Sequence, residues 1–395
     1  MRYFQFLLCS VFLIAVSCGG SPSSLEGNDT SDNSSSYPNR ALLHWSPYVE
    51  WDRSMIEEAA ESKIAVFPIE YCFSPNAGEV IGEMKAINPE IKIIGYRLLL
   101  GAGIPFSDTA TVHSHTPYQI DFYNFSKDHW AWTTTGDTLS GWPGNISLNP
   151  FTDGSLDREF ITEQLDFMEA CMNNAGSYLD GIMHDYFRYS FHIDPSSVEG
   201  EKGDIDLDGD GVIFEQDPDE QEGLLQWQIE FARGIRNRFG EDFIQIGNGR
   251  VPQENAELAG EINGIFYEKF PNMCWGVTDH EGFQILLENQ EPGYLRESCG
   301  RTWSLLTHVE IDYNNYFCLV SSLLADCLYT EVYGKYLFSG WEYDIHPGVP
   351  VSGLQVEGRV DSVISYSREY SFGTAKISFA DYGGRITTEF VKVGY

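Results

Sequence analysis

The chain has 395 residues, 42% of them hydrophobic, which is enough for one large α/β barrel with a full core and short additions at its ends. Its net charge of −35 excludes a nucleic-acid-binding role, because that affinity comes largely from Lys and Arg, and it argues against a strongly anionic polysaccharide as substrate. The 9 Trp and 22 Tyr suit a site for flat amphipathic ligands such as sugars, or alternatively a Tyr-rich core.

The first predicted element is an export signal in residues 1–17. Arg2 gives it a positive start, and the apolar stretch 4–16 is too short to span a bilayer. Ser17 before Cys18-Gly-Gly resembles the end of a bacterial lipoprotein signal, in which Cys18 becomes the lipid-bearing N-terminus. We expect an exported lipoprotein, anchored by this lipid alone to the outer membrane or cell surface. An ordinary cleaved secretory signal is the alternative.

Residues 18–39 are rich in Ser, Asn, Asp and Gly and have almost no apolar side chains, so we interpret them as a flexible tether. Beyond the tether the chain has six cysteines, which permit disulfides in an exported protein without fixing their pairing. No Cys-x-x-Cys pair occurs, which argues against a structural zinc site.

From residue 40 onward, short apolar runs that end on polar or aromatic residues alternate with helical stretches. The runs predicted as buried strands are 41–45, 64–69, 91–95, 181–183, 243–246, 262–267, 302–307 and 336–339. The helices predicted between them include 54–62 with Ser54 as its N-cap, 156–174, 222–239, 256–261 and 316–327. Eight such runs predict a (β/α)8 TIM barrel over residues 40–349.

Two insertions and a tail depart from this alternation. Residues 101–156 are rich in Trp, Tyr, His, Gly and Pro with little periodicity, and a second insertion covers 190–221. Loops of this length in a compact domain are usually functional. Past residue 350, alternating runs at 360–367, 374–379 and 385–393 between Gly-rich turns predict a small C-terminal antiparallel β appendage, 350–395.

The second insertion contains the acidic loop Asp206-Leu-Asp-Gly-Asp-Gly-Val-Ile-Phe-Glu-Gln-Asp217. Acidic residues stand at positions 1, 3, 5 and 12 and a glycine at position 6, the ligand spacing of a twelve-residue EF-hand-type calcium loop. The predicted metal ligands are the carboxylates of Asp206, Asp208, Asp210 and Asp217 and the carbonyl of Val212. We expect a structural Ca2+ that fixes the loop rather than a regulatory switch.

Two alternatives to this calcium loop are open. A second register, from Asp204 to Glu215, also matches the acidic spacing but puts Gly211 where the apolar residue belongs. A solvated acidic loop without a metal is the other alternative. In the preferred register the closing Asp217 is one carbon shorter than the usual Glu, which lowers the expected affinity.

Polar residues follow the ends of the predicted strands, and in a barrel of parallel strands these ends form one bowl. The residues are Glu70, Arg97, Asp185, Asn248, Glu268, Glu310 and Glu342, with Trp45 and Trp341 at the first and last strands. Acidic side chains and Trp platforms at one rim favour cleavage of glycosidic bonds. For any one such carboxylate alone, a loop-capping or salt-bridging role is the simpler interpretation.

The buried run 181–183 leads directly to His184 and Asp185, and we place the active site there. Asp185 is the predicted nucleophile and Glu268 the predicted general acid/base, from the fourth and sixth strands. The predicted substrate-binding residues are Trp45, Glu70, Arg97, Asn248, Glu310 and Trp341.

Two residues beside Asp185 have simpler interpretations. Asp180 lies at the start of the same run and is predicted to make a turn or a hydrogen bond. His184, with His192 and Asp194, imitates a transition-metal site, but the spacing matches no known ligand pattern. We therefore expect His184 to bind substrate or to pack.

Short motifs in this chain resemble those of a family of glycoside-hydrolase-like TIM-barrel proteins, distant relatives of endo-α-1,4-polygalactosaminidases and of the α-galactosidase clan. The motifs are Leu-Asp-Gly-Ile-Met-His-Asp185, Gly-Asn-Gly at 247–249, Asn-Gly-Ile-Phe-Tyr-Glu268 and the tail 364–373. The resemblance implies a carboxylate at the fourth strand and another at the sixth, which match Asp185 and Glu268. The calcium loop and the 101–156 insertion depart from the family pattern, so the substrate is not carried over.

These features together predict a surface-anchored, calcium-stabilised (β/α)8 glycoside hydrolase that acts on a neutral or amino-sugar glycan. The competing hypothesis is a glycan-binding lipoprotein that keeps the barrel and its aromatic residues but has no catalytic activity. The sugar, the linkage, retention or inversion of configuration, and the oligomeric state are open at this point.

Overall fold

The structure is a computed structural model that describes the chain from residue 40 to residue 392 with several gaps. These residues all belong to the second of two compact units into which the chain divides, Ser36–Tyr395. The described ranges are 40–44, 51–73, 77–103, 117–140, 145–175, 179–185, 187, 205–248, 255–268, 270, 278–290, 303–306, 312–333, 347–360 and 362–392.

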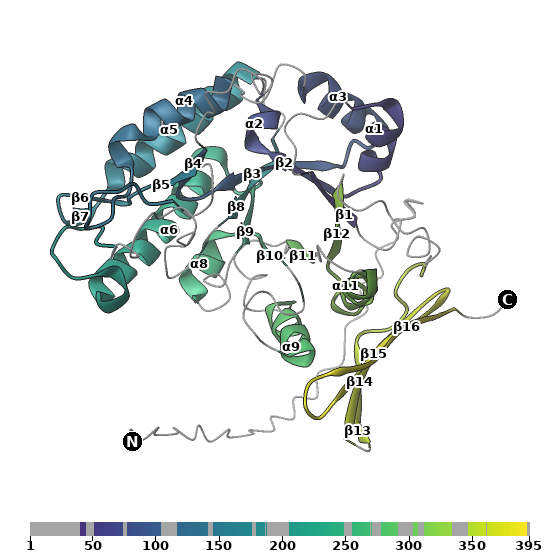
Figure 1. Cartoon of the computed structure of the whole chain (residues 1–395). Helices are drawn as coiled ribbons and strands as arrows, with labels where there is room; N and C mark the ends of the chain where they lie inside the picture. Colours follow the sequence, from purple (N-terminus) through teal and green to yellow (C-terminus); the bar gives the residue numbers. More distant parts are fainter. Residues whose placement is uncertain are drawn as a thin grey trace, which may run out of the picture. The chain divides into compact units, whose positions relative to one another are not determined.

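Eight parallel strands form the centre of the fold (Figure 1). They are β1 (Arg40–His44), β2 (Ile64–Pro68), β3 (Lys92–Leu98), β8 (Gly181–Asp185), β9 (Ile244–Asn248), β10 (Gly264–Tyr267), β11 (Trp303–Leu306) and β12 (Leu328–Tyr333). Each strand pairs with the next one along the chain, and β12 pairs with β1, so that the sheet closes on itself. The predicted mixed α/β class with a curled parallel sheet is confirmed.

Helices separate the barrel strands in sequence. They are α1 (Arg53–Ala60), α2 (Ile69–Cys72), α3 (Ala77–Ile87), α4 (Pro117–Phe125), α5 (Arg158–Ala175), α6 (Pro218–Phe239), α8 (Ala256–Glu261), α9 (Asp279–Gln290) and α11 (Asp312–Ala325). α6 begins with Pro218 at its first position, after the N-cap Asp217, and ends at Gly240, whose φ is 92°. Within the described ranges, none of the helices combines the length and the hydropathy that a bilayer crossing needs.

Side chains of the barrel strands alternate between the two faces of the sheet, as β3 and β8 show. One set fills the barrel interior, as Ile94 of β3 and Met183 of β8 do. The other set packs in the large cluster between the sheet and the helices, as Ile93 and Ile182 do. This period of two also decides which polar residues at the strand ends point into the barrel.

The two insertions contain short regular elements. Between β3 and β8, β4 (Gly101–Gly103) pairs with β5 (Asn145–Ser147), and β6 (Phe151–Thr152) pairs with β7 (Ser155–Leu156). A short 3-10 helix, η2 (Ser126–His129), follows α4. The second insertion, between β8 and β9, holds the acidic loop and η3 (Phe214–Gln216). The described parts of both insertions thus consist of the nine-residue helix α4, short 3-10 helices, turns and short strand pairings.

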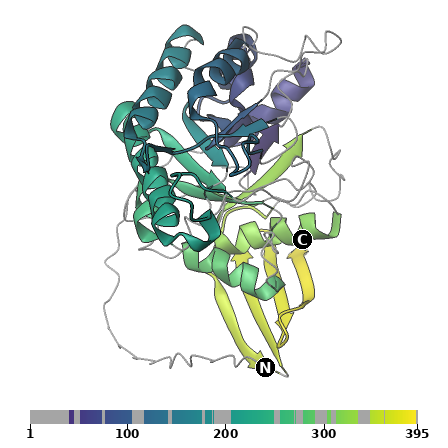
Figure 2. The same cartoon turned by 60° about the vertical axis from the view of Figure 1, so that its left-hand side comes forward.

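An antiparallel sheet follows the barrel, as predicted, but it has four strands where the sequence showed three alternating runs. Its strands, side by side in Figure 2, are β13 (Gln355–Val360), β14 (Val363–Tyr370), β15 (Gly373–Ala380) and β16 (Arg385–Lys392). The hydroxyl of Tyr370 donates a hydrogen bond to the carbonyl of Leu323 in α11. The backbone N–H of Phe390 donates to the hydroxyl of Tyr316 in the same helix at 2.8 Å. The sheet is therefore attached to a barrel helix by both backbone and side-chain contacts.

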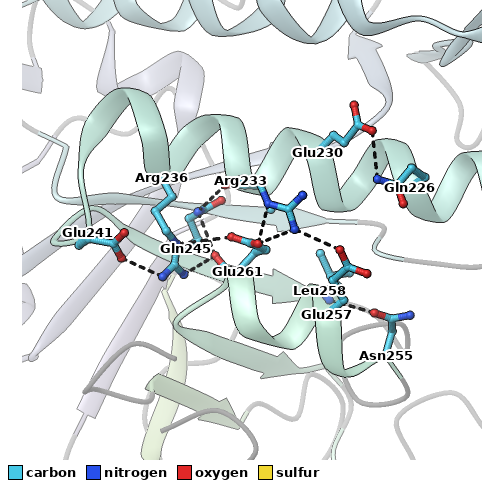
Figure 3. Close-up of polar contacts among 11 residues, drawn as sticks. Gln226, Glu230, Arg233, Arg236, Glu241, Gln245, Asn255, Glu257, Leu258 and Glu261 are labelled. Carbon is cyan, nitrogen blue, oxygen red and sulfur yellow. Dashed lines mark hydrogen bonds and ion pairs between the residues drawn. The ribbon is translucent and has the colours of Figure 1, made fainter. Parts of the chain in front are cut away.

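A polar network joins α6 to α8 beside β9 (Figure 3). Arg233 of α6 forms ion pairs with Glu257 at 3.1 Å and with Glu261 at 2.8 Å. Arg236 donates a hydrogen bond to the carbonyl of Glu261 at 2.6 Å, and Gln245 of β9 donates to the same carbonyl at 3.2 Å. These contacts hold the end of α8 close to β9, and so fix where the following strand, β10, begins.

The eighth barrel strand differs from the prediction. It is β12, Leu328–Tyr333, whereas the predicted run 336–339 lies outside the described residues. The apolar pattern of β12 is interrupted by Glu331, and two of its residues are tyrosines. A search for continuous apolar runs therefore passes over it.

The start of α1 also differs from the prediction. Its N-cap is Asp52 rather than Ser54, because the Asp52 side chain accepts a hydrogen bond from the backbone N–H of Met55 at 2.9 Å. The hydroxyl of Ser54 donates to the same carboxylate at 2.8 Å, so Ser54 supports the cap without forming it.

Gly181, the first residue of β8, yields a prediction about stability. A Cβ there would lie 2.2 Å from the carbonyl oxygen of Ile244 and 2.8 Å from the Cδ1 of Ile94, so the backbones of β8 and β9 would have to separate. We expect Gly181→Ala to lower the free energy of unfolding by at least about 2 kcal/mol. Chemical denaturation measures this change.

Gly82 is the matched control for Gly181. It lies inside α3, and a Cβ there would meet nothing within 4 Å. Gly82→Ala should therefore leave stability unchanged or raise it by up to about 1 kcal/mol. Equal effects at the two positions would contradict the close approach of β8 and β9.

Candidate active site

The side chains of four neighbouring strands meet at the C-terminal end of the barrel interior. Asp185 stands opposite Leu98 of β3 and Asn248 of β9 in the strand register. Asp185, Asn248 and Glu268 each follow, by two residues, a side chain of the interior cluster, namely Met183, Ile246 and Phe266. Since side chains alternate along a strand, all three point towards the same interior.

The amide of Asn248 joins the two predicted catalytic carboxylates. Its Nδ2 donates a hydrogen bond to Oδ1 of Asp185 at 2.9 Å and another to Oε2 of Glu268 at 3.0 Å. The two acceptor oxygens bind one nitrogen, so they lie no more than about 6 Å apart, within reach of one glycosidic bond. The structure thus brings together the acids predicted from the fourth and sixth strands.

A second donor holds Asp185 from the other side. The hydroxyl of Tyr96, on β3, donates a hydrogen bond to Oδ2 of Asp185. Both carboxylate oxygens of Asp185 therefore accept hydrogen bonds, which fixes the orientation of the group. The sequence offered one signal for Tyr96, its position two residues after the interior residue Ile94.

The two carboxylates differ in their exposure. Asp185 is 6% exposed and Asn248 is 7% exposed, whereas Glu268 is half-buried. The backbone of Asp185 is also fixed, because its carbonyl accepts a hydrogen bond from the N–H of Leu99 at 3.0 Å. The pair therefore consists of a deep, rigidly held aspartate and a glutamate nearer to solvent.

Arg97 does not lie in the barrel interior, contrary to the prediction that it binds substrate. It stands next to Tyr96 and so points to the opposite face of β3, where it is buried. Its guanidinium donates hydrogen bonds to Gln164 and to the sulfur of Met168, both on α5. Burial lowers the pKa of Arg97.

Glu70, another predicted substrate-binding residue, lies in α2, half-buried, after β2 has ended. Burial raises the pKa of its carboxyl, and the nearby charge of Arg97 partly offsets this effect. Glu70 is therefore electrostatically coupled to Arg97, on the outer side of the sheet.

Several predicted residues fall outside the described part of the chain. They are Cys18, Trp45, His192, Asp194, Glu310, Trp341 and Glu342. The described site therefore consists of Tyr96, Asp185, Asn248 and Glu268.

The two residues near Asp185 that had simpler interpretations have structural contacts. Asp180 accepts hydrogen bonds from Lys85 at 2.8 Å and from the backbone N–H of Ile93 at 2.9 Å, at the start of β8. His184 is fully buried on the helix-facing side of β8, with Phe187 and Phe231 against its ring. Packing is therefore the role that its surroundings support.

The acidic loop has the turns that its spacing predicted. Asp206 accepts hydrogen bonds from the backbone N–H groups of Gly209 at 2.7 Å and Gly211 at 3.0 Å. Gly211 has a φ of 91°, which a residue with a side chain rarely adopts. The sharp turn at position 6 is therefore present.

Two groups of carboxylates converge around the acidic loop. One oxygen each from Asp208, Asp210 and Asp217 lies within 4.8 Å of the others, and the same holds for Asp206, Asp208 and Glu220. Oxygens that bind one Ca2+ at the usual 2.3–2.6 Å are about this far apart, so the residues fit the ion. In the alternative register the closing residue would be Glu215, which is exposed, whereas Asp217 is buried beside the group.

The acidic loop packs against the first insertion through an apolar cluster that we call the lobe. Its buried members are Ala131, Leu139, Phe151, Ile205, Leu207, Phe214 and Leu224. The side-chain amide of Asn149 also donates a hydrogen bond to the carbonyl of Leu207 at 2.8 Å. Leu100 packs against the lobe. Its neighbour Leu99 donates the backbone hydrogen bond to the carbonyl of Asp185. The lobe thus packs the acidic loop against the segment that follows β3.

No family model matches the sequence, and no curated protein matches it. Solved structures similar to the chain include an α-amylase from H. orenii, with 9% identity over 87% of this chain and 89% of that chain and a TM-score of 0.44. A cyclic α-maltosyl-(1→6)-maltose hydrolase from Arthrobacter globiformis has 12% identity over 87% and 91%, with a TM-score of 0.46. The α-glucosyl transfer enzyme XgtA has 8% identity over 88% and 90%, with a TM-score of 0.46. A likeness at this level carries no argument about the reaction of this chain.

His184 yields a prediction about pH. Burial, and then the charge of Arg97, lower its pKa from 6.5 to about 3. As the pH falls, His184 is therefore protonated in the unfolded chain before it is protonated in the folded protein. The contribution of neutral His184 to the free energy of unfolding is fully present above about pH 6.5 and is lost as the pH drops below that value. From pH 7 to pH 5, the wild type should lose about 2 kcal/mol more of its free energy of unfolding than His184→Met does.

Urea unfolding of both proteins at the two pH values measures this difference. All other titrating groups are common to the two proteins, so the difference isolates His184. Parallel losses in wild type and variant would show that the ring is protonated in the folded state as readily as in the unfolded chain.

Proposed function

We propose that this protein is a retaining glycoside hydrolase, built on a (β/α)8 barrel of the TIM type, with Asp185 as nucleophile and Glu268 as general acid/base. The observation that carries this proposal is the shared amide of Asn248, which binds both carboxylates. Hydrolysis of a glycosidic bond typically uses a pair of carboxyl groups, and in TIM barrels such groups lie at the C-terminal ends of the strands.

The roles follow from the surroundings of each acid. Asp185 accepts hydrogen bonds through both oxygens, from Asn248 and Tyr96, as an ionised nucleophile in a fixed orientation would. Glu268 is nearer to solvent, which suits a group that gives a proton to the leaving oxygen and then takes one from water. Asn248 therefore orients the pair, although the sequence suggested it only as a substrate ligand.

The distance between the acids supports retention of configuration. The two N–H bonds of an amide nitrogen diverge by about 120°, so hydrogen bonds of 2.9 and 3.0 Å along them put the two acceptor oxygens about 5 Å apart. Retaining enzymes have carboxyl groups about 5–5.5 Å apart, whereas inverting enzymes need about 6.5–9.5 Å for a water molecule. Asp185 would form a glycosyl ester as the leaving group departs with the proton of Glu268, and water would then cleave that ester.

The acidic loop is the proposed site of a structural Ca2+. The ligands are the carboxylates of Asp206, Asp208, Asp210 and Asp217 with the carbonyl of Val212. The ion would neutralise part of the crowded negative charge and hold the loop against the lobe. It supplies no step of the reaction in this proposal.

We keep two further proposals about the setting of the enzyme. The signal in residues 1–17 and the lipid on Cys18 would export the protein and anchor it to the outer membrane or cell surface, with residues 18–39 as tether. The substrate would be a neutral or amino-sugar glycan, since the net charge of −35 disfavours anionic polymers.

Replacement of the two acids tests the enzymatic proposal. On a panel of glycans, Glu268→Gln should lower kcat about 10²–10⁴-fold, and Asp185→Asn at least as much. Both variants should fold and should still bind the glycan, because they keep the size of each side chain. Proton NMR of the first product formed by the wild type should show the anomeric configuration of the substrate.

Azide separates the roles of the two acids. With an aryl glycoside whose leaving group needs no proton, Asp185→Ala with azide should give a glycosyl azide of inverted configuration, and Glu268→Ala one of retained configuration.

Binding of a glycan by a wild type that cleaves none would instead support the alternative, a glycan-binding lipoprotein without catalytic activity.

Removal of the ion tests the calcium proposal independently of activity. At a Ca2+ concentration a hundred times the Kd, the ion adds about 2.7 kcal/mol to stability. EGTA should therefore lower Tm by about 3–4 °C, and excess Ca2+ should restore it. An unchanged Tm would count against a structural calcium site.

A further inference from the structure

Glu220 is the carboxylate beside the acidic loop that the twelve-residue spacing does not include. It lies three residues after Asp217, in the first turn of α6, and is 1% exposed. One of its oxygens is within 4.8 Å of ligand oxygens from both Asp206 and Asp208. A buried acid from a helix is thus directed at the loop from outside it.

Among the described residues, hydrogen-bond donors reach one oxygen of Glu220 and not the other. Oε1 accepts bonds from the backbone N–H groups of Leu207 and of Asp208, the latter at 2.9 Å. Oε2 is buried and has no hydrogen-bond partner in the described part of the chain. A buried carboxylate oxygen without a donor is costly, and a cation would remove that cost.

In the described ranges, the acidic groups around Glu220 form no ion pair with a cationic side chain. Ion pairs with Lys, Arg or His reach none of the carboxylates of Asp206, Asp208, Asp210, Asp217 and Glu220 among the described ranges. Five carboxylates that converge in two groups sharing Asp208 fit a site for a hard divalent ion.

The loop itself leaves room for one more ligand. An EF-hand-type loop normally closes with a bidentate Glu at position 12, and here that position holds the shorter Asp217. The loop supplies five ligand groups, whereas Ca2+ takes six to eight oxygens. Glu220 is placed to supply a missing oxygen.

We propose that Glu220 is a direct ligand of the loop cation, so that the metal site includes the first turn of α6 as well as the acidic loop. This inference rests on the calcium site proposed above. The ion would then tie the lobe to the helix that leads into β9 and Asn248. The metal site would then link the second insertion to α6, one of the helices between the barrel strands.

Glu220→Gln is the variant that tests this ligand. Its amide oxygen can still accept the hydrogen bonds from Leu207 and Asp208, while the second oxygen becomes a nitrogen that cannot bind a cation. Asp219→Asn is the matched control, because Asp219 is an exposed acid on the same helical turn. The full chain without its signal is titrated with Ca2+ by calorimetry, and Tm is measured in EGTA and in excess Ca2+.

We expect the Kd for Ca2+ to rise at least about tenfold in Glu220→Gln and less than about twofold in Asp219→Asn. In EGTA, Glu220→Gln should melt at or above the wild-type Tm, because it carries no buried charge, but it should gain less from Ca2+. Calcium binding and a Tm gain equal to those of the wild type would overturn the role of Glu220 and leave the loop site intact. A wild type that binds no Ca2+ would overturn the loop site and this inference together.

Discussion

The hydrogen bonds from the Asn248 amide to Asp185 and Glu268 are the contacts on which the candidate site depends. Two ionised carboxylates whose oxygens lie within about 6 Å of each other would repel by about 3 kcal/mol at an effective dielectric constant of about 20. A neutral side chain that donates to both lowers this repulsion and sets their separation. The hydroxyl of Tyr96 adds a third donor on the far side of Asp185. These donors allow the two carboxylates to stay close together.

The rest of the fold keeps these groups at fixed positions. Gly181 lets β8 and β9 approach closely, which brings Asp185 level with Asn248 in the register. The ion pairs of Arg233 hold α8 against α6 and so set the start of β10, the strand that precedes Glu268. Each of these contacts positions a strand that leads to a site residue, although the contacting residues themselves are not part of the site.

The strand ends were predictable because a buried strand shows as an apolar run that stops on a polar residue. Asp185, Asn248 and Glu268 were found in this way, and their common location followed from the parallel barrel. The same rule failed for Arg97, since it identifies the end of a strand but not the face to which a side chain points. Tyr96, the neighbour of Arg97, occupies the interior position instead.

Other features depended on contacts between distant parts of the chain. β12 contains Glu331 and so lacks a continuous apolar run, and its place in the barrel follows from pairing with β1. Glu220 lies beyond the last position of the loop motif, and only the approach of α6 to Asp206 and Asp208 brings it into the group. The bridging role of Asn248 likewise required coordinates, because sequence does not show which acids an amide contacts.

The residue after Asn248 is Gly249, and Asn-Gly is the dipeptide in which an asparagine side chain most readily loses its amide through a cyclic imide. Asparagine is among the residues that limit protein lifetime at high temperature. Its conversion here to aspartate or isoaspartate would remove the donor and add a third negative charge between the two acids. The low exposure of Asn248 and its place at the end of a strand oppose the ring closure. The packing that positions the acids thus also protects the amide of Asn248 from this chemical ageing.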